Sequence, residues 1–221
     1  MADYSGTLTR VEDYFDRSAT KVWERLTSDA PVSRIRQTVR EGRDQMRALM
    51  LSRLPADLRG ARVLDAGCGA GQMTAELAAR GADVVAVDIS PALIAIAQKR
   101  LPVDLAPRVS FAAGDMTADH GSFDHVLAMD SLIYYGTADI AAALGRLVTR
   151  SRHGVVFTVA PRTPFLMAFF TLGKAFPRRD RSPVMVPHAL ATLQKSTPHR
   201  IAKIDRISRG FYISDCLECR A

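Results

Sequence analysis

The stretch Val63-Leu64-Asp65-Ala66-Gly67-Cys68-Gly69-Ala70-Gly71 decides the fold, because it joins an apolar strand to a helix through a glycine-rich turn. The strand is expected over residues 62–64 and the helix over residues 72–80. The three glycines fall where the backbone needs a positive φ or room for a ligand to contact it. This turn predicts a nucleotide-type cofactor site at the end of a buried strand.

The spacing of the glycines indicates which cofactor is bound. Asp65 precedes a Gly-x-Gly-x-Gly series, whereas dinucleotide sites carry Gly-x-Gly-x-x-Gly and aim a helix N-terminus at a pyrophosphate. A carboxylate inside the turn would repel phosphate and attract an ammonium group. The turn therefore predicts S-adenosylmethionine as the cofactor.

Two further strands end in polar residues that suit the same site. The strand over residues 83–88 ends in Asp88, about twenty residues after the turn, where a ribose is usually held through its hydroxyls. The strand over residues 108–112 leads to Gly114-Asp115-Met116, in which Met116 can lie against adenine while Asp115 accepts from its amino group. A single Asp of this kind is more often a loop carboxylate or a helix N-cap. At successive strand ends, the set favours a cofactor site.

These motifs, together with the expected strand over residues 123–130, resemble the successive motifs of class I S-adenosylmethionine-dependent methyltransferases across residues 60–160. The resemblance implies a seven-stranded, mainly parallel α/β sheet with helices on both faces. The residues assigned to cofactor binding are Tyr14, Asp65, Ala66, Gly67, Gly69, Gly71, Asp88, Ile89, Gly114, Asp115, Met116, Asp130 and Ser131. The core motifs do not indicate what is methylated.

Length and composition favour a single domain. A chain of 221 residues with 48% hydrophobic content can bury one α/β core. We expect a helical arm over residues 1–57, the cofactor-binding core over 58–160, a substrate lid over 161–199 and two final strands over 200–221. No stretch reaches the roughly 18 apolar residues of a spanning helix, and the start does not resemble a signal peptide. A cytoplasmic protein is expected.

The cysteines and histidines do not predict a metal site. Cys216 and Cys219 have Cys-x-x-Cys spacing, yet no second pair or His partner accompanies them, so they are interpreted with Cys68 as reduced structural thiols. The five histidines show no i, i+3 or i, i+4 pairing. His188, beside the lid, remains a candidate axial ligand for a substrate's own metal, against the simpler interpretation of a surface or capping residue.

A net charge of +7 and a pI near 9.7 suit nucleic acid, an anionic membrane or an acidic small substrate. The basic residues form two zones, Arg34, Arg36, Arg40, Arg43, Arg47 and Arg53 before the core and Lys174, Arg178, Arg179 and Arg181 after it. Neither zone is interleaved with stacking aromatics, and no nucleic-acid module is recognisable. A nucleic-acid partner is therefore not expected, and an RNA methyltransferase is a secondary alternative. Solvated helix faces would account for about half of these arginines under any function.

The N-terminal arm is predicted to contain three helices. Thr9 and the Glu three residues later form a capping box for the first, which places Tyr14 on an apolar face near the ligand. The second passes through Trp23, for which ordinary packing against the core is an equal alternative. The third begins at Pro31 and continues to about Leu54.

The lid combines an apolar block with a basic end. Phe165, Phe169 and Phe170 belong to a helix-length apolar run, and Arg178 follows a few residues later. This pattern predicts a lid for a large, flat, apolar molecule that carries carboxylates, or an element that enters a membrane surface.

A narrower resemblance covers nearly the whole chain. Residues 11–16, Trp23-Glu-Arg, residues 36–43 and residues 128–135 resemble the magnesium-protoporphyrin IX methyltransferases of bacteriochlorophyll synthesis. The resemblance implies transfer of a methyl group to one propionate of magnesium protoporphyrin IX, which gives the monomethyl ester and S-adenosylhomocysteine. Phe165, Phe169, Phe170 and Arg178 would then bind the porphyrin. Further implied partnerships are the porphyrin-binding subunit of magnesium chelatase and peripheral attachment to the inner face of the photosynthetic membrane.

Two positions depart from that family's pattern. Chlorophyll-making relatives carry a Tyr and a His with assigned catalytic roles where this chain has Thr27 and Tyr134. A propionate is already ionised near neutral pH, so it needs no general base, and Tyr134 is expected to orient the substrate. The alternatives are another small-molecule methyltransferase acting on a quinone or carboxylate, and a non-catalytic cofactor-binding protein.

Overall fold

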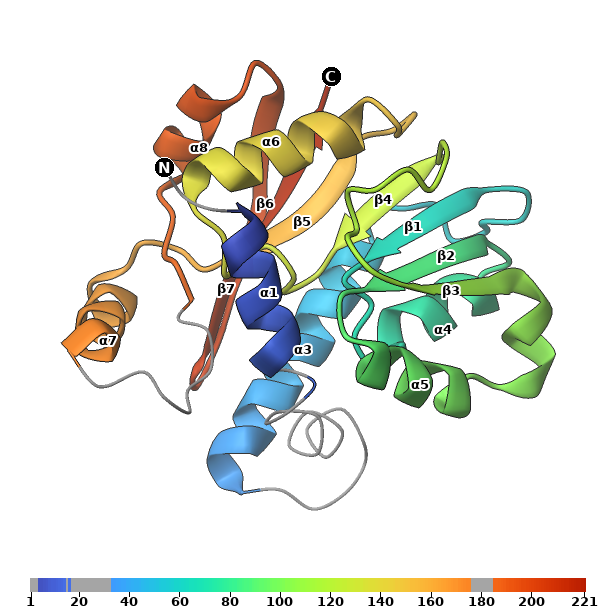
Figure 1. Ribbon diagram of the computed structural model, residues 1–221, viewed down its shortest axis with the longest axis horizontal. Coiled ribbons are helices and arrows are strands. Elements are labelled where there is room, and N and C mark those ends of the chain that lie inside the picture. The colour runs from blue at the N-terminus through green and yellow to red at the C-terminus, as the bar shows by residue number, and fades with distance from the viewer. Residues whose placement is uncertain (1–3, 15, 17–32, 176–184) are drawn as a thin grey trace.

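The computed structural model describes residues 4–14, 16, 33–175 and 185–221, which form a central sheet with helices on both faces (Figure 1). The sheet order is β3-β2-β1-β4-β5-β7-β6. The strands are β1 (Arg62–Ala66), β2 (Asp83–Asp88), β3 (Val109–Ala113), β4 (His125–Ala128), β5 (Val155–Val159), β6 (Arg200–Arg209) and β7 (Tyr212–Arg220). β1 to β5 are mutually parallel, whereas β7 is antiparallel to both of its neighbours.

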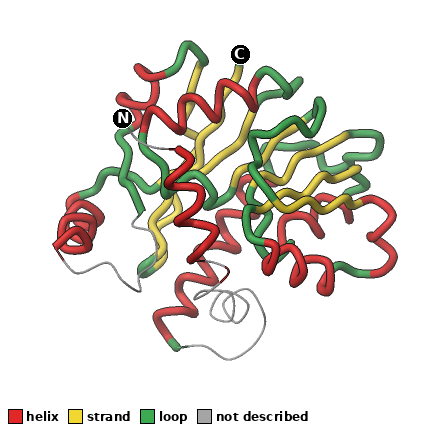
Figure 2. The backbone as a smooth tube through the Cα atoms, in the orientation of Figure 1, coloured by secondary structure: helices red, strands yellow, loops and turns green. Residues whose placement is uncertain are grey.

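Helices and one 3₁₀ segment connect the strands, as the alternation of red and yellow in Figure 2 shows. They are α1 (Tyr4–Tyr14), α3 (Arg34–Leu51), α4 (Gln72–Ala79), α5 (Pro91–Arg100), η2 (Val103–Arg108), α6 (Thr137–Val148), α7 (Pro164–Ala175) and α8 (Leu190–Ser196). The predicted architecture is confirmed, because the sheet has seven strands, only β7 runs antiparallel to its neighbours, and helices cover both faces. The division of the chain at residues 57, 160 and 199 stays a prediction.

The core consists of two apolar layers, one on each face of the sheet. β5 is buried at every position, because helices cover both faces of a parallel strand. One layer packs α6 and α8 against the sheet, and the other packs α3 and α4. Cys216 and Cys219 of β7 belong to opposite layers, and both are fully buried free thiols. Their interpretation as structural thiols is confirmed.

The helical arm differs from its prediction in two places. Thr9 lies inside α1 and its hydroxyl donates to the Ser5 carbonyl at 3.2 Å, so the predicted capping box is wrong. α3 begins at Arg34 rather than at Pro31, because Ser33 has an extended backbone and its hydroxyl accepts from the Arg36 amide at 3.4 Å. The predicted second helix, with Trp23 and Thr27, lies outside the described residues.

The lid leaves the sheet after β5 and returns beside the loop that follows β4. α7 lies away from the sheet, at the left of Figure 1. The returning segment donates from the Val186 amide to the Ile133 carbonyl and from the His188 amide to the Ala160 carbonyl, each at 2.8 Å. In the described part of the chain, no helix combines the length and apolar character needed to span a bilayer.

Candidate cofactor and active site

The glycine-rich turn has the conformation that its sequence predicts. Gly67, Gly69 and Gly71 have φ values of 85°, 54° and 82°, a region that favours glycine. The turn is tied to the adjacent strand because the amides of Gly67 and Cys68 donate to the Val87 carbonyl at 2.7 and 3.0 Å. Gly71 then begins α4 as its N-cap residue.

The turn approaches the loop after β4 closely. A Cβ added to Gly67 would lie 2.3 Å from the Cβ of Ser131, so only glycine fits at this position. The Ser131 hydroxyl is buried and has no hydrogen-bond partner among the described residues. Because a buried polar atom without a partner is costly, this hydroxyl is suited to contact a bound ligand.

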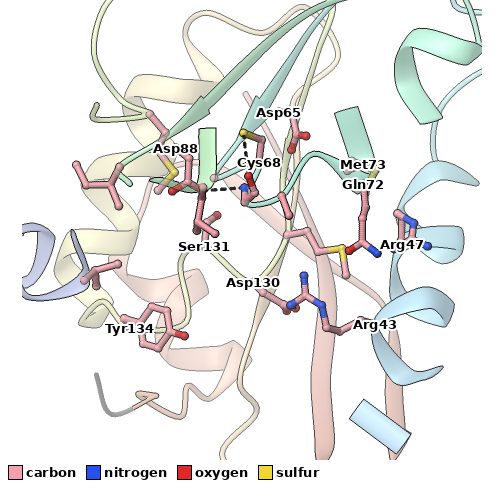
Figure 3. Close-up of a pocket in the computed structure, with 18 of the residues that line it drawn as sticks. Arg43, Arg47, Asp65, Cys68, Gln72, Met73, Asp88, Asp130, Ser131 and Tyr134 are labelled. Atoms are coloured by element: carbon pink, nitrogen blue, oxygen red, sulfur yellow. Dashed lines mark hydrogen bonds and ion pairs between the residues drawn. The ribbon is translucent and has the colours of Figure 1, made fainter. Parts of the chain in front are cut away.

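Two buried carboxylates form an acidic side of the site (Figure 3). Asp65 is 1% exposed and accepts from the Thr74 hydroxyl at 2.6 Å. Burial, with a smaller contribution from the charge of Asp88, raises the pKa of Asp65 to about 7. Asp88 accepts from the Gly69 and Ser90 amides at 2.8 and 3.0 Å, and burial raises its pKa as well.

Two arginines of α3 form the opposite, basic side (Figure 3). The guanidinium of Arg43 donates to a carboxylate oxygen of Asp130 at 2.5 Å, and that of Arg47 donates to Glu76 at 3.0 Å. Neither arginine is among the predicted cofactor ligands. Their spacing of four residues, on one helical face, is the sequence signal that could have identified them.

Asp130 is held in an uncommon conformation at the end of β4. Its φ of 54° is the only positive value of a non-glycine residue in the described part of the chain. Its carboxylate accepts from the Tyr212 hydroxyl at 3.0 Å and from the Thr158 hydroxyl at 3.2 Å, in addition to Arg43. This network ties β7 and α3 to the site, and residues held in such strained conformations cluster at functional sites.

These side chains surround a pocket with about 870 Å³ of space, counted out to open solvent. The predicted residues on its wall are Asp65, Gly67, Gly69, Asp88, Ile89, Gly114, Met116, Asp130, Ser131 and Tyr134. Wall residues that the sequence did not indicate include Leu8, Val11, Arg43, Arg47, Gln72 and Met73. Leu8 and Val11 place α1 directly over the pocket.

Other predicted site residues lie beside the pocket rather than on its wall. Tyr14 packs with Val11 and Leu93 in a small apolar cluster that also contacts Tyr134. Ala66 is buried within β1. The Asp115 carboxylate accepts from the Tyr4 hydroxyl at 2.8 Å and from Thr117, so its expected contact with adenine stays a prediction.

The lid residues are only partly described. Phe165 is 45% exposed and its ring lies 6.5 Å from that of Phe211. The side chains of Phe169 and Phe170, and all of Arg178, lie outside the described residues, so their role in porphyrin binding stays a prediction.

The hypothesis that His188 ligates a substrate's metal is wrong. His188 is 5% exposed, and its two ring nitrogens lie 3.0 Å from the Tyr135 carbonyl and 3.1 Å from the Thr137 hydroxyl. Burial lowers its pKa, so the ring is neutral and serves as an internal bridge between the lid and α6. Within the described ranges, no three His, Cys, Asp or Glu residues form a group able to hold a metal ion.

Tyr134 is half-buried on the pocket wall, and its hydroxyl points toward Arg43 and Asp130 in Figure 3. Burial, followed by the charge of Asp130, raises the pKa of Tyr134 well above its usual value. The phenol is therefore protonated at neutral pH and can donate a hydrogen bond, but it cannot act as a base there.

Known proteins match this sequence and structure over nearly their full length. A family described as magnesium-protoporphyrin IX methyltransferase C-terminus matches residues 128–221, and a methyltransferase domain family matches residues 63–154. The magnesium-protoporphyrin O-methyltransferase of Rhodobacter capsulatus is 62% identical over 221 residues, which cover 99% of each chain.

Solved structures give the same result. The crystal structure of magnesium protoporphyrin IX methyltransferase (ChlM) from Synechocystis PCC 6803 with bound SAH has a TM-score of 0.81 and 29% identity, covering 96% of this chain and 99% of that one. The fold and the site thus define a class I S-adenosylmethionine-dependent methyltransferase, as predicted. More narrowly, the chain belongs to the magnesium-protoporphyrin O-methyltransferase family.

Proposed function

We propose that the chain transfers a methyl group from S-adenosylmethionine to one propionate of magnesium protoporphyrin IX. The observation that carries this proposal is the 62% identity to the Rhodobacter capsulatus enzyme over 99% of both chains. The bound cofactor supplies a sulfonium methyl: a carboxylate oxygen bonds to its carbon, the carbon–sulfur bond breaks, and the electron pair stays on sulfur to give S-adenosylhomocysteine.

The pocket suits the charge distribution of this cofactor. Its methionine portion carries an ammonium and a carboxylate, and the acidic side with Asp65 lies opposite the basic side with Arg43 and Arg47. The Ser131 hydroxyl offers a further buried polar contact on the pocket wall. Asp88, Met116 and Ile89 line the pocket, and in this proposal Asp88 accepts from ribose hydroxyls while Met116 and Ile89 contact the adenine.

The chain's part in the chemistry is to position the reactants. The attacking carboxylate arrives deprotonated, so no side chain has to remove a proton. Holding its oxygen in line with the methyl carbon at about 3 Å, in a cleft covered by α1, lowers the barrier through proximity and exclusion of water. Tyr134 contributes a hydrogen bond that orients the substrate carboxylate.

Changing Tyr134→Phe should therefore reduce turnover only several-fold. The lost hydrogen bond contributes on the order of 1 kcal/mol, and no proton transfer depends on the phenol. Single-turnover methyl transfer, followed across pH for parent and variant, would measure this. A loss of about four orders of magnitude with both ligands still bound would show that Tyr134 performs essential chemistry.

Cofactor binding should strengthen as the pH rises through about 7, because the ammonium group favours ionised Asp65 and the cofactor-free protein holds that carboxyl with a pKa of about 7. We expect about an eightfold gain in affinity from roughly pH 6 to 7.5. Because burial in the fold raises this pKa, protonated Asp65 also stabilises the cofactor-free fold at low pH. This contribution to stability is lost as the pH rises through about 7. Calorimetry should show that cofactor affinity rises with pH for the parent but not for Asp65→Asn. The same pH dependence of affinity in both proteins would exclude Asp65 as the group responsible.

Peripheral attachment to a membrane and contact with the porphyrin-binding subunit of magnesium chelatase are part of the same proposal. The net charge of +7 and the apolar sequence of α7 support an anionic, partly apolar partner. Sedimentation with anionic and zwitterionic vesicles tests the first contact, and co-purification with the chelatase subunit tests the second.

The proposed function is tested by offering the purified chain and S-adenosylmethionine a choice of acceptors. Magnesium protoporphyrin IX should gain one methyl group by mass spectrometry, whereas a catechol-type quinone precursor should gain none. Methylation of the quinone precursor in preference to the porphyrin would assign the chain to the alternative substrate class.

A further inference from the structure

Tyr212 of β7 connects the C-terminal strands to the wall of the cofactor pocket. Its side chain is buried, and its hydroxyl donates to Oδ1 of Asp130 at 3.0 Å. Burial raises the pKa of Tyr212, so the phenol keeps its proton and stays a hydrogen-bond donor. Asp130 lines the pocket and Tyr212 lies behind it. An effect of this hydroxyl on a ligand therefore passes through Asp130.

A glycine in the interior of α3 allows the helix to approach Tyr212 closely. A Cβ added to Gly42 would lie 2.7 Å from Cδ1 of Tyr212 and 2.8 Å from its Cβ. Glycine weakens a helix interior relative to alanine, so helix propensity does not account for this residue, whereas the close approach does. Because Arg43 follows directly, this contact also sets where the Arg43 side chain leaves the helix.

The two carboxylate oxygens of Asp130 have different partners. Oδ1 accepts from the Tyr212 hydroxyl and, at 3.2 Å, from the Thr158 hydroxyl. Oδ2 accepts from Nη1 of Arg43 at 2.5 Å, beside the pocket (Figure 3). The Thr158 hydroxyl also accepts from the Asp130 amide at 2.8 Å, which braces a residue with a strained φ of 54°. Two hydroxyls thus fix Oδ1, and Oδ2 is directed at the guanidinium of Arg43.

We propose that Tyr212 is a positioning residue that holds Arg43, through Asp130, against the carboxylate in the methionine portion of S-adenosylmethionine. A guanidinium carries five N–H donors in a planar fork, so it can bond to Asp130 and to a ligand carboxylate together. This inference rests on the proposed function, because it uses the orientation of the cofactor given there. It adds a residue behind the pocket wall to the groups that set cofactor affinity.

Decarboxylated S-adenosylmethionine separates positioning from a purely structural role. It keeps the nucleoside, the sulfonium and the ammonium group, and it lacks only the carboxylate. If Tyr212 merely filled the space beside α3, loss of its hydroxyl would weaken both ligands alike. If it positions Arg43, the loss should appear only with the ligand that carries the carboxylate.

Tyr212→Phe should weaken binding of S-adenosylmethionine about tenfold, because the ring still packs on Gly42 while Asp130 and Arg43 lose their fixed orientation. The same variant should bind decarboxylated S-adenosylmethionine within about twofold of the parent. The parent itself should lose about 10- to 100-fold in affinity when the carboxylate is removed from the ligand. Calorimetry measures all of these affinities.

Thr158 provides a second, independent pair of variants. Thr158→Val removes the other hydroxyl on Oδ1 of Asp130 and should reproduce the carboxylate-dependent loss, whereas Thr158→Ser keeps the hydroxyl and should bind as the parent does. If Tyr212→Phe does not fold, this pair makes the same comparison.

Cys216→Ala is the matched control for Tyr212→Phe. Cys216 is fully buried on the same face of β7, in the same apolar layer as Tyr212, and it lies away from the pocket wall. Its truncation loosens the packing of that layer without removing a hydrogen bond to Asp130. Affinities for both ligands should therefore match those of the parent.

Three outcomes would contradict different parts of the proposal. Equal losses for both ligands in Tyr212→Phe, or parental affinity for both, would overturn this inference alone. A parent that binds both ligands equally well would overturn the contact between Arg43 and the cofactor carboxylate, and the inference with it. A parent that binds S-adenosylmethionine but does not methylate magnesium protoporphyrin would instead overturn the proposed function.

Discussion

Replacing Gly67 by alanine should abolish measurable cofactor binding, the largest effect expected of any single substitution here. An L-residue at a φ of 85° costs about 1–3 kcal/mol, and the new Cβ would lie 2.3 Å from the Cβ of Ser131. The turn and the loop after β4 would both have to move, and both form the pocket wall. We expect cofactor affinity to fall by more than about a hundredfold, as measured by calorimetry.

Gly60→Ala provides the matched control for Gly67→Ala. Gly60 has a φ of 78°, but a Cβ there meets no atom within 4 Å. The variant therefore carries the same backbone strain without the clash, and it should bind cofactor as the parent does. A folded Gly67→Ala protein with parental affinity would show that the close approach to Ser131 is not required.

Replacing Asp88 by alanine should have the next largest effect. The Asp88 carboxylate organises the turn through the Gly69 and Ser90 amides, at 2.8 and 3.0 Å, and we propose that it also accepts from the ribose. Charge-assisted hydrogen bonds of this kind contribute about 1.5–3 kcal/mol, so we expect about a 10- to 100-fold loss of affinity for S-adenosylmethionine.

Asp83, at the other end of the same strand, supplies the control for Asp88→Ala. Its side chain is 66% exposed and pairs with Arg108 at 3.5 Å. Because an exposed ion pair contributes little, Asp83→Ala should leave cofactor affinity unchanged. Equal affinities for the two variants would remove Asp88 from the cofactor site.

Much of the fold follows from local patterns in the sequence. β2 has its predicted bounds, and β1 extends only two residues beyond the predicted strand, because short apolar runs bounded by turns identify buried strands. The glycine turn could also be predicted from the sequence, because the need for a positive φ depends on only a few consecutive residues. The predicted capping box at Thr9 failed because a Thr hydroxyl inside a helix can bond to the preceding turn instead.

Only part of the site could be predicted from the sequence. Local patterns identify some of its residues, whereas others are brought together by packing between distant segments. Residues at successive strand ends converge at one edge of a parallel sheet, so Asp65 and Asp88 could be placed together. The pairing of Arg43 with Asp130, 87 residues apart, depends on how α3 packs across the sheet. The burial of His188 likewise follows from the return path of the lid, which no local pattern predicts.

The most direct test of the account is to follow a labelled methyl group from the cofactor to the porphyrin. The purified chain would be mixed with S-adenosylmethionine labelled in its methyl group and with magnesium protoporphyrin IX, in a single turnover. We expect one labelled methyl per porphyrin, bound as an ester that mild base hydrolyses to labelled methanol. Label on a ring carbon or nitrogen, or cofactor bound with no label transferred, would contradict it.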